Sequence, residues 1–195
     1  MTTEVKKIVR FIKLLDTFKF IKRKIYLNDK NRLENDAEHS WHVAMMVWLF
    51  SGYLGKKINS ERAIKMALMH DLVEIYAGDT FAYDSSGRIG KADREKKAAK
   101  KLFSKLPQES KKEFEEIWKE VEDKKTPEAG LVQAMDKLQP ILQNILVRGK
   151  NHQKFKVTEQ MIRAEKSRHF MGNDLLKELF EETLKENSRI NSLNK

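Results

Sequence analysis

Apolar residues recur every three to four positions over most of the chain, a spacing that predicts helices. Residues 4–20 carry such a stripe on one broad face, and residues 60–77 carry another. The segment at 36–54 is apolar on nearly all sides from Val43 onward. Because a helix that is apolar all round is usually buried, we expect this segment to lie at the centre of the fold.

Residues typical of helix ends set the limits of further helices. Asn35 and Glu38 have the spacing of a reciprocal capping pair, Ser60 is expected to open the third helix, and Thr126 precedes a first-turn proline and a first-turn acid. Gly55, Gly78 and Gly149 are expected to end helices. The predicted helices cover 4–20, 36–54, 60–77, 93–106, 108–123 and 127–148, and two more follow Thr158 and Asn173.

The remaining segments are predicted to be irregular. Residues 27–35 and 79–91 are polar and indicate loops, and the chain is expected to fray from Asn187 onward. There is no internal repeat and no sustained strand-like alternation. We therefore predict one all-α domain over residues 1–195, with about seven to eight helices. Its core would span about 10–150, and the C-terminal helices at 158–190 would pack on it.

The composition restricts both the location and the chemistry. Cysteine is absent, which excludes disulfides and thiolate metal sites, so any metal must be held by nitrogen and oxygen. The longest apolar run has eight residues, far below the roughly 18–20 needed to span a bilayer. The first residues lack an apolar signal core. A cytoplasmic protein is the expectation.

The net charge of +10 raises the question of a polyanionic partner. The basic residues are spread along the whole chain and most stand among acidic ones, as in KKEFEEIWKE. No basic run is interleaved with aromatic residues, so a Lys-rich solvated surface is the better interpretation than a nucleic-acid interface. A small phosphate-bearing substrate is compatible with this charge.

His70 and Asp71 stand within an apolar run, next to positions that have core spacing. Charged and ionisable side chains are rarely buried without a partner, and a divalent metal ion would supply one. On a continuous helix the two residues would point about 100° apart, so both could hold an ion beside the helix. Two ligands are too few, and others must come from elsewhere.

Two further residues are out of place in the same way. His39 lies in the first turn of the apolar central helix, and Asp136 interrupts an apolar helix four residues before Pro140, which should bend that helix. His42 shares the region of His39 but is interpreted as structural or exposed. Together His39, His70, Asp71 and Asp136 offer two imidazoles and two carboxylates. Such a set, with positions left for water and substrate, suits Mn²⁺, Co²⁺, Fe²⁺ or Ni²⁺, and less well Zn²⁺ or Mg²⁺.

Three segments that carry these residues match a known pattern in its order. AEHSWHVA contains His39, MHDLVEIYAGD contains His70 and Asp71, and AMDKL contains Asp136. The chain thereby resembles the HD-domain superfamily of metal-dependent phosphohydrolases, and the extended motif is similar to the branch with bacterial 5′-deoxynucleotidases. The resemblance covers about residues 10–150 and implies a helical HD-domain bundle in which these four residues bind one divalent metal.

The resemblance also implies roles for four other residues. Glu74 would manage the proton of the attacking water, and it follows His70 by one helical turn. Asp79 would lie near the sugar of the substrate. Arg23 would contact the phosphate, and Tyr26 would lie by the sugar. The implied reaction is release of phosphate from a phosphate monoester, most simply a (deoxy)nucleoside 5′-monophosphate.

Other functions fit the residues less well. Alarmone hydrolases of the superfamily carry an acidic pair after the HD motif, whereas here Ile75 follows Glu74. Two-metal cyclic-dinucleotide phosphodiesterases need extra histidines, and residues 71–151 contain none. A basic helical module that binds nucleic acid without turnover is the alternative from another class. For partners, we expect a small nucleotide, no membrane, and a homodimer suggested by apolar residues of the C-terminal helices.

Overall fold

The computed structural model describes residues 2–27, 32–54 and 58–192. The chain begins with α1 (Thr3–Leu15), continues through the 3₁₀ helix η1 (Asp16–Phe20), and forms a hairpin of the antiparallel strands β1 (Lys22–Tyr26) and β2 (Leu33–Asn35). The following helices are α2 (Asp36–Leu54), α3 (Ser60–Met69), α4 (Glu74–Ala77), α5 (Lys91–Phe103), α6 (Gln108–Asp123), α7 (Pro127–Leu146), α8 (Lys150–Phe155), α9 (Glu159–Lys166), the 3₁₀ turn η3 (Ser167–His169) and α10 (Asp174–Ser192). The all-α class is confirmed. Helix α4 lies within the single helix predicted over 60–77, and α8 lies where no helix was predicted.

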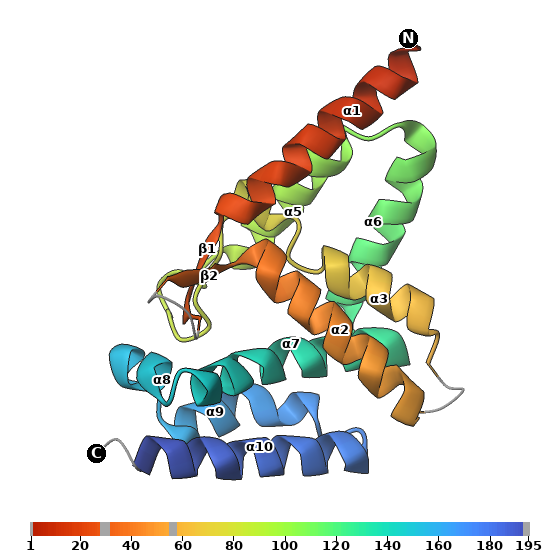
Figure 1. Cartoon of the computed structure of the whole chain (residues 1–195). Helices are drawn as coiled ribbons and strands as arrows, with labels where there is room; N and C mark the ends of the chain where they lie inside the picture. Colours follow the sequence, from red (N-terminus) through yellow and green to blue (C-terminus); the bar gives the residue numbers. More distant parts are fainter. Residues whose placement is uncertain (1, 28–31, 55–57, 193–195) are drawn as a thin grey trace.

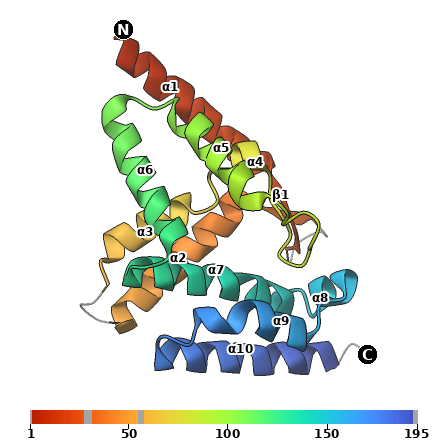
Figure 2. The ribbon, with the colours of Figure 1, turned by 180° about the vertical axis from the view of Figure 1, so that it is seen from behind.

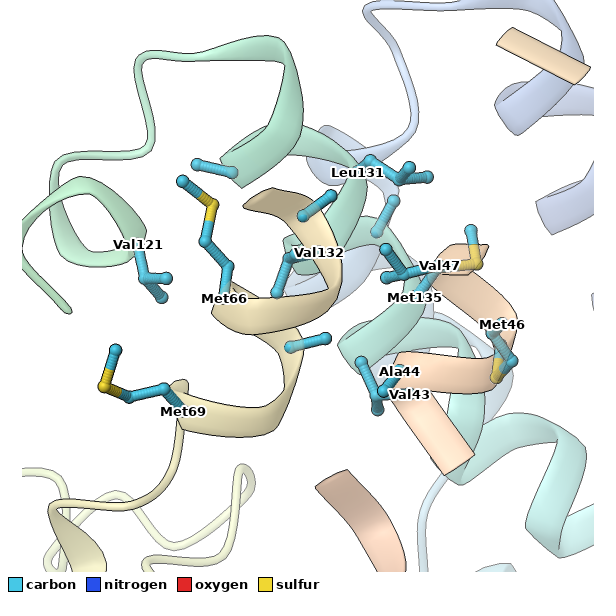
Figure 3. Close-up of a cluster of buried hydrophobic side chains, with 14 of the residues drawn as sticks. Val43, Ala44, Met46, Val47, Met66, Met69, Val121, Leu131, Val132 and Met135 are labelled. Carbon is cyan, nitrogen blue, oxygen red and sulfur yellow. The ribbon is translucent and has the colours of Figure 1, made fainter. Parts of the chain in front are cut away.

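The core lies where α2, α3 and α7 cross (Figure 3). Val43 and Val47 of α2, Met66 of α3, and Val132 and Met135 of α7 are all fully buried there. This confirms that the apolar segment at 36–54 is central. Figure 1 shows α1, α5 and α6 on one side of α7, and α10 on the other. Because the three core helices meet at one point, polar residues beside their core positions also meet.

The predicted capping residues begin their helices as expected. The backbone N–H of Asn35 donates to Glu38 Oε2 at 3.0 Å, and the N–H of Glu38 donates to Asn35 Oδ1 at 3.0 Å. Thr126, Thr158 and Asn173 accept the corresponding bonds at the starts of α7, α9 and α10. Each such cap contributes about 1 kcal/mol to stability.

The helix expected over 60–77 begins at Ser60 as predicted, but it is divided, and its cap is the preceding residue. Asn59, not Ser60, caps α3 by accepting from the N–H of Arg62 at 3.0 Å. Helix α3 ends at Met69, and a turn leads to α4. Gly78, with a φ of 74°, caps the C-terminal end of α4. His70 and Asp71 therefore lie at a helix end and in a turn, where the backbone direction is not fixed by a helical repeat.

The hairpin and the C-terminal end of the chain differ from the expectation. Residues 22–26 and 33–35 pair as strands, although the pattern showed no strand-like alternation and predicted a loop over 27–35. At the other end, α10 continues to Ser192 because Asn187 is buried and accepts a hydrogen bond of 2.7 Å from Asn144 of α7. The expected stop at Gly55 lies outside the described residues. In the part of the chain that is described, no helix has the length and apolar character to cross a bilayer.

Candidate metal centre

Four side chains converge at the crossing of α2, α3 and α7. His39 Nε2 lies 3.1 Å from Asp136 Oδ1, and His70 Nε2 lies 3.2 Å from Asp71 Oδ2. One ligand atom of each of the four residues lies within 4.8 Å of the others. The structure thus brings together the four residues that the sequence selected as metal ligands.

Both imidazoles are oriented by their other ring nitrogen. His70 Nδ1 donates to the carbonyl oxygen of Ala67 at 2.7 Å, and His39 Nδ1 lies 3.1 Å from Gln139 Oε1. The amide of Gln139 is itself held, because its Nε2 donates to Glu34 Oε1 at 2.7 Å. A proton on Nδ1 leaves the Nε2 lone pair of each ring directed into the centre, the arrangement typical of metal-binding histidines.

The charges of the centre favour a cation. Burial lowers the pKa of His70, but the carboxylates of Asp71 and Asp136 outweigh it and raise that pKa to about 10. Burial opposes ionisation of Asp71 and Asp136 as well, yet their cationic neighbours hold the pKa of both carboxyls below its usual range. By contrast, burial and the charge of Arg23 lower the pKa of His39 to about 4. Two ionised carboxylates therefore face two ring nitrogens, and positive charge between them is stabilised.

This donor set fits a divalent metal ion. His70 Nε2 is buried and has no hydrogen-bond partner among the described residues, which is the expected state of a ligand atom. Neighbouring ligands about 2.1 Å from an octahedral ion lie about 3 Å apart, close to the shortest separations in the centre. Nitrogen and oxygen donors together suit Mn²⁺, Fe²⁺, Co²⁺ and Ni²⁺.

A second group of carboxylates adjoins the first and shares Asp71 with it. Asp36, Asp71 and Glu74 place one oxygen each within 4.8 Å of the others. Arg23 balances this group, since its Nη1 lies 2.8 Å from Asp71 Oδ2, 3.3 Å from Asp36 Oδ1 and 4.0 Å from Asp79 Oδ1. Burial and the charge of Asp71 raise the pKa of Asp36 to about 7. The positive charge of Arg23 is thus already balanced by several carboxylates.

Glu74 and Asp79 lie beside the centre, not within its ligand set. Glu74 is buried at the start of α4, and its Oε2 has no hydrogen-bond partner among the described residues. Burial, followed by the charges of Asp71 and Asp36, raises the pKa of Glu74 well above its ordinary value. Burial also raises the pKa of Asp79. Both side chains line the same cavity as the ligand set, so they are placed to act on a molecule bound there.

A cavity of about 420 Å³ opens in front of these residues, within the range typical of small-molecule sites. One wall comes from the loop between α4 and α5, which Figure 2 shows next to β1. Phe81 of this loop packs on Phe155 of α8 with 5.2 Å between ring centroids, and Arg88 pairs with Glu165 of α9 at 2.9 Å. The loop expected at 79–91 is therefore attached to the C-terminal helices across the cavity.

Arg23 and Tyr26 lie on opposite faces of β1. Arg23 points to the carboxylates and lines the cavity. Tyr26 stacks on Phe155 with 6.5 Å between ring centroids and carries Lys150 above its ring, outside the described residues that line the cavity. The structure thus brings Arg23 to the centre and places Tyr26 behind its wall. Roles for both with the substrate stay predictions.

Several residues of the site were not found from the sequence. Asp36 and Glu34 are both fully buried, and Gln139 links Glu34 to His39. Asp36 looked like an ordinary first-turn acid, and Glu34 fell in a segment predicted to be a loop. Lys166, the last residue of α9, is also buried and lines the cavity. Its neighbours in sequence are mostly charged, so nothing marked it as buried.

Comparison with protein families gives a match over most of the chain. The model of the HD domain matches residues 15–177. A curated relative from Dictyostelium discoideum, the 5′-deoxynucleotidase HDDC2, is 36% identical over 141 residues, which cover 69% of this chain and 74% of the relative. The human protein of the same name is 29% identical over 140 residues, which cover 71% of this chain and 67% of the relative.

A solved structure shares both the fold and part of the sequence. It is that of a predicted metal-dependent phosphohydrolase from Magnetospirillum magnetotacticum MS-1, which superposes with a TM-score of 0.87. The two proteins are 35% identical, and the match covers 96% of this chain and 94% of the other. The match therefore reaches beyond the region around 10–150 in which the sequence motifs lie.

Proposed function

The chain belongs to the HD-domain family, and from this premise we propose that it is a metal-dependent phosphohydrolase that releases phosphate from (deoxy)nucleoside 5′-monophosphates. One observation carries the proposal: the ligand atoms of His39, His70, Asp71 and Asp136 lie within 4.8 Å of one another, and the last three residues line a cavity of about 420 Å³. The relatives named 5′-deoxynucleotidase support the substrate class.

One divalent ion is the proposed cofactor, with Mn²⁺, Co²⁺, Fe²⁺ or Ni²⁺ favoured over Zn²⁺ and Mg²⁺. The support is the donor set, in which imidazole nitrogen and carboxylate oxygen are equally represented and thiolate is absent. When bound, such an ion polarises the phosphoryl oxygens and lowers the pKa of a water molecule.

The residues of the chain supply the rest of the chemistry. Glu74 accepts the proton of the attacking water, because it lines the cavity and its buried Oε2 has no other partner among the described residues. Arg23 contacts the phosphate and Asp79 the sugar, and Tyr26 supports the sugar-side wall through Phe155. The loop that carries Phe81 packs on Phe155 across the cavity and limits the access of bulk solvent to the bound substrate.

A panel of nucleotides tests the substrate class. Phosphate should be released from nucleoside 5′-monophosphates in the presence of a favoured metal, and not from cyclic dinucleotides or guanosine tetraphosphate. The reason lies in the motif: Ile75 stands where alarmone hydrolases have a second acid, and a second histidine set is missing from 71–151. Robust hydrolysis of either excluded substrate, with inert monophosphates, would contradict the assignment.

The nucleic-acid alternative makes a different prediction. A basic binding module should retain DNA or RNA at low salt and lose it steeply as salt rises, without metal-dependent turnover. The buried ligand set favours the enzyme, since such a set is costly to keep without an ion.

We also propose that the chain forms a homodimer through α2, not through the C-terminal helices. Trp41, Trp48, Leu49 and Tyr53 form a stripe along α2, and each is at least 60% exposed. Figure 1 shows α2 on the near side of the molecule. Residues 40–54 contain no Asp, Glu, Lys or Arg, so two copies of a chain with net charge +10 can meet there without opposing like charges.

Light scattering after gel filtration tests this dimer. Trp48→Glu should shift the molar mass from that of two chains toward one, because it places a charge at the centre of the apolar stripe. Met171→Glu is the matched control, since Met171 is 63% exposed and lies between η3 and α10, outside the stripe on α2. An unchanged mass in both variants, or a monomeric parent protein, would contradict the dimer.

A further inference from the structure

Lys166 is a buried lysine whose charge has no carboxylate partner. It is 4% exposed, and its Nζ donates one hydrogen bond, of 2.9 Å, to the carbonyl oxygen of Lys137 in α7. An ammonium group has three N–H donors, so two are left without an acceptor among the described residues. Within the described part of the chain Lys166 forms no ion pair, although a buried charge is normally paired.

The surroundings of Lys166 place it at the cavity near the metal centre. It lines the cavity together with Lys137, and the charges of Asp136, Arg23 and Glu165 all act on it. Burial, with the like charge of Lys137, lowers the pKa of Lys166 to about 7. Lys137 is itself paired with Asp136 at 2.7 Å, so the nearby Asp136 carboxylate is already engaged by another lysine.

Arg23 differs from Lys166 in this respect. Its guanidinium lies within 4.0 Å of carboxylate oxygens of Asp36, Asp71, Asp79 and Glu34. Its positive charge is thus already balanced by protein groups, whereas the charge of Lys166 is not. A ligand anion in the cavity would therefore gain more from the charge of Lys166, which is buried and lacks an ion pair among the described residues, than from that of Arg23.

We propose that Lys166 binds the phosphate group of the substrate, so that α9 supplies a phosphate-binding residue to a site otherwise built from β1, α2, α3, α4 and α7. The inference deepens the proposed function and rests on it. The oxygens of an entering phosphate accept hydrogen bonds from the two remaining N–H groups of Lys166, and its negative charge compensates the ammonium. A role as a structural tie between α9 and α7 would need only the single bond to the Lys137 carbonyl.

Calorimetry with inorganic phosphate tests this role on the full, metal-loaded chain. Lys166→Met keeps the length of the side chain and removes the charge, and Lys166→Gln keeps a hydrogen-bond donor without the charge. Both should bind phosphate about 10- to 100-fold more weakly, the usual effect of losing a charged hydrogen bond. Lys154→Met is the matched control, because Lys154 of α8 is exposed and lies outside the cavity lining. It should bind phosphate as the parent protein does.

Two further measurements separate binding from stability. Metal content should be unchanged, and Lys166→Met should melt at the same or a higher temperature, since an uncompensated buried charge is removed. A nucleoside without phosphate should bind parent and variant equally.

The proposal is overturned if the parent protein binds no phosphate, if both uncharged variants bind it within about twofold of the parent, or if both lose cooperative melting, as a structural tie predicts. Its failure is distinct from that of the proposed function. Lys166-dependent phosphate binding without hydrolysis of any monophosphate would remove the function and keep the anion site. Hydrolysis of monophosphates together with phosphate binding that does not depend on Lys166 would keep the function and remove the anion site.

Discussion

Alanine at position 71 is expected to remove the bound metal and, with it, essentially all turnover. Asp71 Oδ2 lies 3.2 Å from His70 Nε2 and 3.7 Å from His39 Nε2, so its loss takes an anionic donor from the middle of the ligand set. Metal should then also stop protecting the protein against heat. For the parent protein this protection is about 2.7 kcal/mol when metal is at a hundredfold excess over its dissociation constant.

Elemental analysis of the purified Asp71→Ala variant, with melting in the presence and absence of metal, measures both effects. Asp93→Ala is a suitable control, since Asp93 is an exposed carboxylate on α5. Melting without metal should show that the variant folds, because Arg23 keeps Asp36 as a partner at 3.3 Å. Unchanged metal content in Asp71→Ala would show that the ligand assignment is incorrect.

The residues of the proposed ligand set could be selected from the sequence because each breaks an apolar helical pattern. His70 follows the core residue Met69, and Asp136 follows the core residue Met135. Their meeting point could not be derived in the same way. The sequence pattern does not tell how α2, α3 and α7 cross, and only the match to three ordered motifs indicated it.

The residues around the ligand set carry no comparable signal. Asp36 is a first-turn acid that would be equally normal on a solvated helix. Lys166 lies in a helix whose exposed positions are also charged, so its burial depends on how α9 packs against α7. The partners of Arg23 depend on β1, which the pattern did not show as a strand. The surroundings of Asp36, Lys166 and Arg23 are all decided by contacts between segments that are distant in the sequence.

Local signals explain which parts of the fold were predicted correctly. The capping pair of Asn35 and Glu38 involves residues three apart, and it forms as expected. The break after Met69 has no glycine or proline to mark it, and apolar residues continue at helical spacing through it. The strand at 22–26 is five residues long and mostly basic, so its pairing with β2 was not visible.

Glutamine at position 74 is expected to slow turnover by a factor of about 10² to 10⁴ while metal and fold are kept. This range is the usual contribution of a positioned proton-transfer group and corresponds to roughly 3–5 kcal/mol of barrier. Glu74 is 2% exposed and lies within 4.8 Å of Asp71 and Asp36, but it is outside the set of four ligand residues. Glutamine keeps the shape and hydrogen bonding of the side chain but cannot take a proton.

The raised pKa of Glu74 gives a second expectation for the same variant. Burial and the nearby carboxylates of Asp71 and Asp36 favour the neutral form of Glu74. A carboxyl whose pKa is raised by folding contributes stability below its unfolded pKa, and this contribution is lost as the pH rises through the folded pKa. Glutamine stays neutral throughout, so Glu74→Gln should melt at the same or a higher temperature than the metal-free parent at neutral pH.

Metal content and turnover measured on the same sample decide between the roles of Glu74. Glu61→Gln is the control, since the side chain of Glu61 is 82% exposed on α3 and its change should leave turnover intact. Slow turnover in a fully metallated Glu74→Gln variant is the result that proton transfer requires. Near-normal turnover would remove Glu74 from the mechanism and leave Asp79, which lines the same cavity, as the next residue to test. Loss of metal would instead make Glu74 a ligand or a support of Asp71, because the two carboxylates adjoin each other in the second acidic group.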